Sequence, residues 1–186
     1  MSKINALLQR NEQFVSTFTP VPLGPPAAEV LVVTCLDHRV DPSDFLGLQL
    51  GDAPVIRNLG GRVTKAVIND IAFFAFVAEQ MFGDPNSTET LFEVAVIHHN
   101  QCGSGNLADD NFRRRYAQLI GVDEVELRDL AVLDPTASVA TDVDRLRSAN
   151  AISSRVTVSG HIYDVVTGEV NTLIPAMGTY ERSGAR

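Results

Sequence analysis

The chain has 186 residues, of which 45% are hydrophobic and 20% charged, and its formal net charge is −8. This composition is typical of a globular protein with a real core, and the negative charge argues against nucleic acid or an anionic membrane surface as the main partner. No apolar run approaches the roughly 18 residues of a membrane span, and the N-terminus lacks a signal-peptide pattern, so we expect no membrane partner and a cytoplasmic protein.

The N-terminal region is expected to form a separate helix. Residues 4–18 carry apolar side chains at helical spacing. The Pro-rich segment 19–29 cannot continue a helix. We therefore expect residues 1–28 to form a helical arm and a connector, and residues 29–186 to form one α/β domain. Such a detached helix is a common arrangement for an arm that packs on a second subunit.

The body alternates between predicted strands and helices. Apolar runs predict strands at 30–36, 53–61 and 91–100. Helical spacing and end signals predict helices at 41–47 (capped by Asp41, with Pro42 first), 64–83 (between Thr64 and Gly83), 107–121 and 134–150. The last part of 125–133 is predicted to be a strand or extended. Residues 155–174 predict a strand and a hairpin that turns at Thr167-Gly168.

The order of these elements predicts an α/β fold with a mostly parallel central sheet flanked by helices. Near-continuous apolar strands suit a parallel sheet that is covered on both faces. In such sheets, ligand groups gather beyond the carboxyl ends of the strands. Polar segments follow three predicted strands at residues 35–39, 57–61 and 98–105. We therefore expect these three segments to open onto one edge of the sheet.

Three of these side chains predict a metal site. His99 and Cys102 have a His-x-x-Cys spacing, and Cys35 adds a second thiolate from a neighbouring strand. Two thiolates and one imidazole form a tetrahedral set that prefers zinc and leaves one position free, which is the catalytic arrangement. Bound zinc lowers the pKa of its water from about 15.7 to about 7 and so supplies hydroxide at neutral pH.

Asp37 has two possible roles beside this set. It is either a fourth ligand, which closes the site, or a carboxylate held by Arg39 that accepts the hydrogen bond of the metal-bound water. Each feature alone has a simpler interpretation, because a buried cysteine is most often a small apolar residue and a surface Asp-Arg pair contributes about 1 kcal/mol at most. The conjunction of both cysteines with these groups at strand ends favours a metal site.

At these residues the sequence resembles the β-class carbonic anhydrases. That family carries Cys-x-Asp-x-Arg and, further along the chain, His-x-x-Cys, which here are "CLDHR" (35–39) and "HNQC" (99–102). The segment "VIRNLGG" (55–61) resembles the family's Arg-Asn segment, and "SGHIYDVVTGEV" (159–170) resembles its last strand pair. The resemblance runs from about Glu29 to Leu173.

The resemblance implies one Zn²⁺ per subunit on Cys35, His99 and Cys102, with an Asp37-Arg39 dyad. It also implies a homodimer or a dimer of dimers (homotetramer), in which the N-terminal helix embraces the partner and the substrate pocket lies near the subunit interface. The domain 29–186 would then be the zinc-binding catalytic domain. A substrate pocket is expected at Leu59, Gly60, Val63 and Gly103, where Gly103 offers a backbone N–H.

The sequence also departs from the family pattern. Leu59 replaces a common alanine, His38 stands where a small residue is common, and the absence of tryptophan excludes the Trp-containing bicarbonate site of some members. If Leu59 points inward, it reshapes the pocket beside the metal. His38, His98 and His161 are expected to serve packing or the surface rather than proton transfer.

Three functions follow from these residues. The first is zinc-dependent hydration of carbon dioxide to bicarbonate by a carbonic anhydrase-type lyase. The second is a carbonyl sulfide or carbon disulfide hydrolase with the same zinc site, which Leu59 keeps open because only pocket shape separates these linear substrates. The third is a non-catalytic zinc-binding protein whose metal is closed by Asp37.

Overall fold

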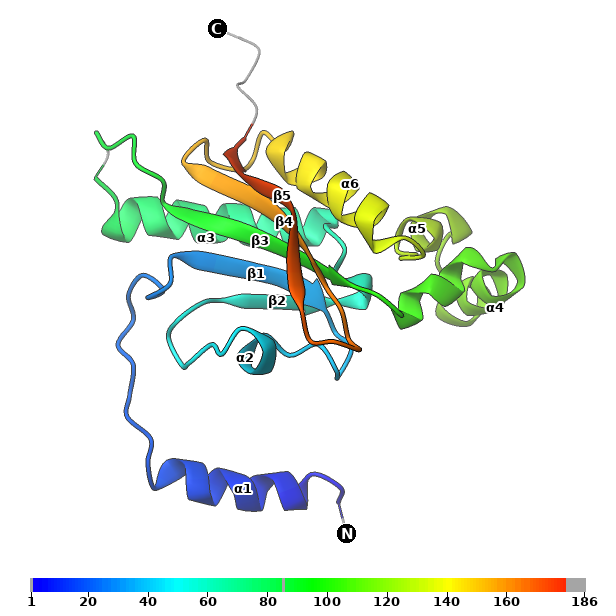
Figure 1. The fold of residues 1–186 in the computed structure, drawn as a ribbon, viewed down its shortest axis with the longest axis horizontal. Helices are drawn as coiled ribbons and strands as arrows, with labels where there is room; N and C mark the ends of the chain where they lie inside the picture. The colour runs from blue at the N-terminus through cyan, green and yellow to red at the C-terminus, as the bar shows by residue number, and fades with distance from the viewer. Residues whose placement is uncertain (1, 85, 180–186) are drawn as a thin grey trace, which may run out of the picture.

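The computed structural model describes residues 2–84 and 86–179 and has a five-stranded sheet at its centre (Figure 1). The strand order is β2-β1-β3-β4-β5, and all neighbours are parallel except β4 and β5. The strands are β1 (Val30–Cys35), β2 (Val55–Asn58), β3 (Phe92–His99), β4 (Val156–Tyr163) and β5 (Val170–Gly178). This arrangement confirms the predicted α/β fold with a mostly parallel sheet.

In the described chain, every helix after the first lies between two consecutive strands. The helices are α1 (Asn5–Val15), α2 (Pro42–Phe45), α3 (Lys65–Phe82), α4 (Asp110–Ile120), α5 (Glu124–Asp129) and α6 (Pro135–Arg147), with 3-10 turns η1 (Leu59–Gly61) and η2 (Gly103–Ala108). Among residues 2–84 and 86–179, no helix combines the length and the apolar character that crossing a membrane requires.

The predicted helix starts are confirmed by their caps. The carboxylate of Asp41 accepts a hydrogen bond from the backbone N–H of Ser43, and Pro42 takes the first position of α2. The hydroxyl of Thr64 accepts one from the backbone N–H of Val67 at the start of α3. These side chains satisfy backbone donors that the first helical turn leaves without partners.

Segment 125–133 forms no strand, so of the two alternatives predicted for its last part only an extended segment remains. The last part of segment 125–133 was expected to be a strand or extended, but its first part completes the short helix α5 and residues 130–133 join no strand. Asp123 caps α5, and Leu127 packs with Leu107 and Ala117. A helix of six residues shows too little of the 3.6-residue period to be recognised in the sequence.

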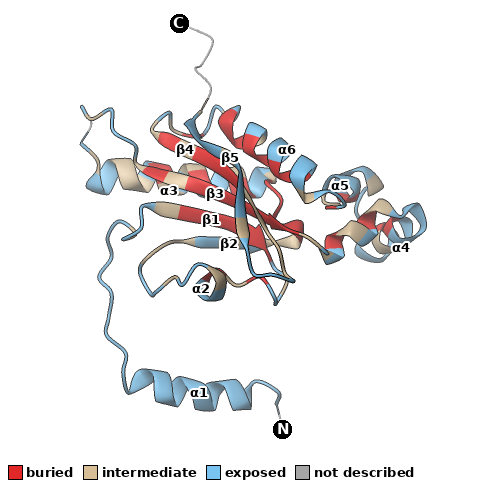
Figure 2. Cartoon of the chain, viewed as in Figure 1, coloured by how far each residue is buried: buried red, intermediate tan, exposed pale blue. Residues whose placement is uncertain are grey.

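The two faces of the sheet are covered unequally (Figure 2). Helices α3 and α6 pack on one face and bury most of the core, around residues such as Ile71, Val94 and Val143. The other face has a smaller cluster of Val32, Ala95 and Ile97, partly covered by residues around α2. Within the described chain, helices therefore cover one face of the sheet well. They cover the other face only in part, because α2 has four residues.

Helix α1 stands apart from the body, and no residue of this helix is buried in the described chain (Figures 1 and 2). Helix α1 and the residues just before and after it expose six large apolar side chains: Ile4, Leu7, Leu8, Phe14, Val15 and Phe18. The division at residue 28 stays a prediction, and the last part of the predicted domain, residues 180–186, lies outside the described residues.

Candidate metal centre

The ends of three parallel strands place the predicted ligands at one edge of the sheet. Cys35 ends β1 and pairs with Asn58 at the end of β2. His99 ends β3, and Cys102 follows it by three residues. Because β1, β2 and β3 run in the same direction, their carboxyl ends meet, as the sequence predicted.

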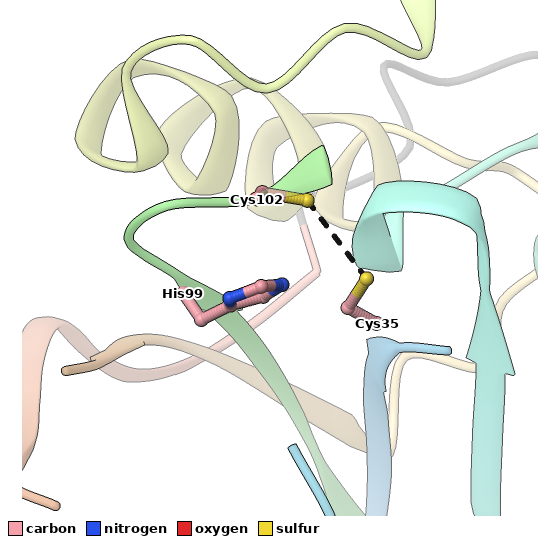
Figure 3. Close-up of side chains that lie close together, drawn as sticks. All are labelled: Cys35, His99 and Cys102. Carbon is pink, nitrogen blue, oxygen red and sulfur yellow. Dashed lines mark hydrogen bonds between the residues drawn. The ribbon is translucent and has the colours of Figure 1, made fainter. Parts of the chain in front are cut away.

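The three side chains have the spacing of a metal site (Figure 3). The sulfurs of Cys35 and Cys102 and a ring nitrogen of His99 all lie within 4.8 Å of one another. The two sulfurs are 3.9 Å apart. Two Zn–S bonds of about 2.3 Å at a tetrahedral angle would separate them by about 3.8 Å, whereas a disulfide needs about 2.05 Å. The separation fits an ion between the sulfurs.

The hydrogen bonding of His99 also fits a metal. Its Nδ1 lies 2.8 Å from the carbonyl oxygen of Asn100, so Nδ1–H donates and Nε2 keeps its lone pair. Nε2 is buried and has no hydrogen-bond partner among the described residues. A buried polar atom without a partner is rare. A histidine that binds a metal through one ring nitrogen typically donates a hydrogen bond from the other, as Nδ1 does here. The donor set therefore fits a zinc ion.

Hydrogen-bond donors lie beside both sulfurs, and they favour the thiolate form of Cys102. The hydroxyl of Ser104 lies 3.1 Å from the sulfur of Cys102, and the backbone N–H of Asp37 lies 3.4 Å from the sulfur of Cys35. The hydrogen bond from Cys35, together with that from Ser104, lowers the pKa of Cys102. In the same pair, the hydrogen bond to Cys102 raises the pKa of Cys35.

The loop between His99 and Cys102 turns through an unusual backbone conformation. Gln101 has a φ of 53°, in the left-handed region that side chains other than glycine rarely adopt. The guanidinium of Arg39 donates to the carbonyl oxygen of Gln101 over 3.1 Å and so helps to hold this turn. Arg39, which also donates hydrogen bonds to Asp37, therefore helps to fix the loop that joins two candidate ligands.

Asp37 is held by Arg39 through two parallel hydrogen bonds. Nε of Arg39 lies 3.0 Å from Oδ1, and Nη2 lies 2.7 Å from Oδ2. The hydrogen bonds of Arg39 hold the pKa of Asp37 well below its usual range. The carboxylate of Asp37 is not among the described ligand atoms that lie within 4.8 Å of one another. The pair favours the second of the two roles expected for Asp37.

Arg57 secures the loop after β1. Its guanidinium donates to the carbonyl oxygen of Cys35 (3.1 Å), to that of Asp37 (2.8 Å) and to the carboxylate of Asp41 (3.1 Å). One side chain from β2 therefore holds the backbone at a candidate ligand and at Asp37. The sequence pointed to this segment but not to these contacts.

The predicted pocket residues lie in different surroundings. Leu59 packs with a cluster that includes Leu107 and Leu127, and Val63 is buried in the main core. Gly60 is buried against Ser104 and the 130–132 segment. At Gly103, an added Cβ would meet no described atom within 4 Å, so its backbone borders open space. Their contact with substrate stays a prediction.

The three histidines without a predicted site role also differ. His38 is exposed, and its Nδ1 lies 3.7 Å from the carboxylate of Asp37. His98 is fully buried beside Asp142. His161 is half-buried and contacts Ser159 and Thr172, and burial lowers its pKa.

Sequence reasoning missed three residues around the site: Ser104, Arg62 and Asp142. Ser104 contacts Cys102 two residues along the chain, a spacing that could have indicated it. Arg62 and Asp142 form a buried ion pair across 80 residues. No local pattern links such distant residues, so a single sequence gives no signal for this pair.

Comparisons with known proteins identify relatives of this chain. No family model matches the chain. Beta-carbonic anhydrase 1 of Mycobacterium tuberculosis is 28% identical over 176 residues, which cover 94% of this chain and all of that protein. The carbon disulfide hydrolase of Acidithiobacillus thiooxidans is 30% identical over 158 residues, covering 75% of this chain and 74% of that protein.

A solved structure gives the same result. The crystal structure of carbonic anhydrase from Streptococcus mutans has a TM-score of 0.75 and 32% identity, and covers 93% of this chain and 98% of that chain. The chain belongs to the β-carbonic anhydrase family, which includes carbon disulfide hydrolase relatives. The cluster of Cys35, His99 and Cys102 is of the type that holds zinc in this family.

Proposed function

We propose that this protein hydrates carbon dioxide to bicarbonate with one zinc ion per subunit, held by Cys35, His99 and Cys102. The observation that carries the proposal is the cluster of two thiols and an imidazole whose Nε2 has no other described partner. When bound there, zinc would supply a Lewis acid that activates water as a nucleophile near neutral pH. Family membership supports the same chemistry.

Asp37 and Arg39 would orient the nucleophile. The side chain of Asp37 is mostly buried, whereas that of Arg39 is 40% exposed. Two hydrogen bonds from Arg39 keep the carboxylate ionised and fix its plane. An ionised carboxylate is an acceptor only, so it would accept a hydrogen bond from the attacking water and direct a lone pair of that water at the carbon of the substrate.

The substrate pocket is proposed beside this dyad, at Leu59, Gly60, Val63 and Gly103. Gly103 has the strongest support, because its backbone borders open space one residue after Cys102. Its N–H would donate to an oxygen of the substrate. Leu59 packs with Leu107 and Leu127, so its effect on pocket shape would act through the position of η1.

The test is zinc content and substrate-resolved kinetics on one preparation. Cys35→Ser should lose both zinc and carbon dioxide hydration, because it removes one thiolate ligand. Thr34→Ser is a matched control on the same buried strand, since a serine keeps the hydroxyl that donates to the carbonyl oxygen of Ile97. A Cys35→Ser protein with full zinc content would contradict the proposal.

A second candidate is hydrolysis of carbonyl sulfide or carbon disulfide at the same site. The 30% identity to a carbon disulfide hydrolase supports it. Both reactions need a nucleophile beside an apolar linear substrate, so the metal ligands do not separate them. Release of sulfide at a higher kcat/KM than hydration of carbon dioxide would favour this candidate.

A non-catalytic zinc protein is the third candidate, and it would need Asp37 as a fourth ligand. The hold of Arg39 on both carboxylate oxygens argues against that role. Four protein ligands at every pH, with no turnover of any of the three substrates, would favour this candidate over the enzyme.

We also propose a homodimer or a dimer of dimers. The exposed apolar side chains of α1 support it, since an isolated helix of 11 residues is marginal in water without packing. In such an assembly, α1 of one copy would pack on the sheet face of a second copy that α2 covers only in part. The partners are therefore a small-molecule substrate and this chain itself.

A further inference from the structure

Asp142 on α6 is a carboxylate buried completely behind the candidate metal centre. Arg62 donates to it from Nε over 2.7 Å and from Nη2 over 3.2 Å, and Arg145 donates from Nη1 over 3.0 Å. Nε2 of His98 lies 3.2 Å from its Oδ2. A buried ion pair is weak evidence for stability, because desolvation offsets the attraction. The presence of this network therefore suggests a role besides stability.

The first connection leads to Cys35. Arg62 follows Gly61, whose backbone lies against that of the first ligand: an added Cβ on Gly61 would be 2.9 Å from the backbone nitrogen of Cys35. The carbonyl oxygen of Arg62 also accepts a hydrogen bond from the side chain of Asn58, the residue paired with Cys35. A contact that fixes the position of Arg62 therefore also fixes the end of β1.

The second connection leads to His99. His98 precedes this ligand on β3 and is fully buried. Its Nε2 lies 3.1 Å from the carbonyl oxygen of Gly61 and 3.2 Å from the carboxylate of Asp142. Both neighbours accept hydrogen bonds, so Nε2 carries the proton. The end of β3 is thereby tied to α6 and to the turn at Gly61.

The third connection leads to Cys102. Arg62 donates to the carbonyl oxygens of Asp129 and Ala131 and so holds the segment after α5. That segment packs on η2, since an added Cβ on Gly105 would be 3.0 Å from the carbonyl oxygen of Val132. The N–H of Gly105 donates to the carbonyl oxygen of Cys102 over 3.0 Å.

We propose that Asp142 is a positioning residue of the metal centre, which fixes the relative places of the three ligand-bearing segments through Arg62 and His98. It touches neither metal nor substrate and acts through these two side chains. The proposal rests on the metal site of the proposed function but not on the identity of its substrate. Ligands held in place lose less freedom when the metal binds, so the network should raise metal affinity.

The experiment compares Asp142→Asn with Arg147→Met in the full-length protein. Arg147 is a matched control because it is also on α6 and buried, but its guanidinium binds the carbonyl oxygens of Val158 and Pro175 on β4 and β5. Zinc affinity is measured by competition with a chelator, and ligand geometry by the visible absorption of the Co²⁺-substituted protein. Urea unfolding of the metal-free proteins gives their stability.

We expect Asp142→Asn to weaken zinc binding about 10- to 100-fold and to change the Co²⁺ spectrum. Arg147→Met should lose stability, but its zinc affinity should stay within about twofold of the wild type and its Co²⁺ spectrum should not change. A folded Asp142→Asn protein with wild-type zinc affinity and spectrum would overturn the proposal. So would an equal loss of affinity in Arg147→Met, since the effect would then follow stability alone.

Arg62→Lys provides a second variant if Asp142→Asn does not fold. A lysine keeps the charge but cannot hold the carboxylate and the two carbonyl oxygens together. Weaker zinc binding with a changed Co²⁺ spectrum would support the proposal, and unchanged metal readouts would overturn it. Zinc affinity needs no substrate, so a wild-type protein that binds zinc without hydrating carbon dioxide would contradict the proposed function and leave this test valid.

Discussion

The backbone of Gly61 lies directly against the backbone of Cys35. An added Cβ on Gly61 would be 2.9 Å from the backbone nitrogen of Cys35 and 2.9 Å from the carbonyl carbon of Thr34. Gly61 also has a φ of 68°, a backbone conformation that residues other than glycine rarely adopt. The turn after β2 can therefore approach the first candidate ligand only because this position has no side chain.

Gly61→Ala should destabilise the protein more than the same change at a turn with open space. Gly168 is the matched control, since its φ is 79° and an added Cβ meets no described atom within 4 Å. The left-handed backbone costs about 1–2 kcal/mol in both variants, and the close contact adds about 1–3 kcal/mol at Gly61. Urea unfolding checks this, and equal stability of both variants would refute it.

Arg39→Lys should lower kcat/KM for carbon dioxide hydration by about 10- to 100-fold, the equivalent of one lost hydrogen bond to a charged group. A lysine keeps the charge but cannot hold both oxygens of Asp37 and the carbonyl oxygen of Gln101. Zinc content should stay at the wild-type level. Arg114→Lys is the control, because Arg114 is exposed and pairs with Glu124. Wild-type kinetics in Arg39→Lys would exclude a role for the dyad.

Ser104→Ala should weaken zinc binding by about tenfold, since it removes the hydroxyl that donates to the sulfur of Cys102. Competition with a chelator measures the effect. Ser138→Ala is the control, because Ser138 is also buried but donates to the carbonyl oxygen of Asp134, the residue that caps α6. If both variants bind zinc equally well, the hydrogen bond to the sulfur does not contribute.

The stability provided by Asp142 should depend on pH. Burial alone would raise its pKa, but hydrogen bonds from His98 and Arg62 outweigh burial, and the net pKa is below its usual value. The folded state therefore binds the proton less tightly than the unfolded state. The stabilisation is complete above the unfolded pKa of about 3.9 and is lost as the pH falls through the lower folded value.

Urea unfolding of the metal-free wild type and Asp142→Asn between about pH 5 and pH 3 checks this sign. The difference in stability should shrink as the pH falls. Arg62, Arg145 and His98 face the carboxylate, and all three are donors to it in this range. A difference that widens towards pH 3 would contradict the lowered pKa.

Phe14→Glu should weaken self-association by about tenfold or more, because it places a charge in the exposed apolar stripe of α1. Gln9→Glu adds the same charge at an exposed polar position of the same helix and should leave the assembly unchanged. Light scattering after size-exclusion chromatography measures the mass. A monomeric wild-type protein would refute the proposed assembly.

The sequence predicts the parts of this structure that depend on local patterns. Cys35 and His99 each end an apolar strand, and parallel strands bring their carboxyl ends together, so the meeting of these two residues follows from the predicted parallel sheet. Caps such as Asp41 and Thr64 are also local, since their partners lie two or three residues away.

Other features depend on contacts between distant segments, which one sequence does not reveal. Arg62 meets Asp142 across 80 residues. The left-handed backbone of Gln101 is held by Arg39, 62 residues away. Helix α5 is fixed by the packing of Leu127 rather than by its own short pattern. The uneven cover of the sheet depends on how short α2 is.

The two candidate sulfur ligands are 67 residues apart in the chain. They meet only after β1 and β3 have paired in parallel, a non-local step that is slow in folding. Zinc bound as proposed would therefore bind after this pairing, in contrast to small zinc domains, which unfold without metal. In that case a scarcity of zinc would lower the proposed activity while the amount of folded protein stayed the same.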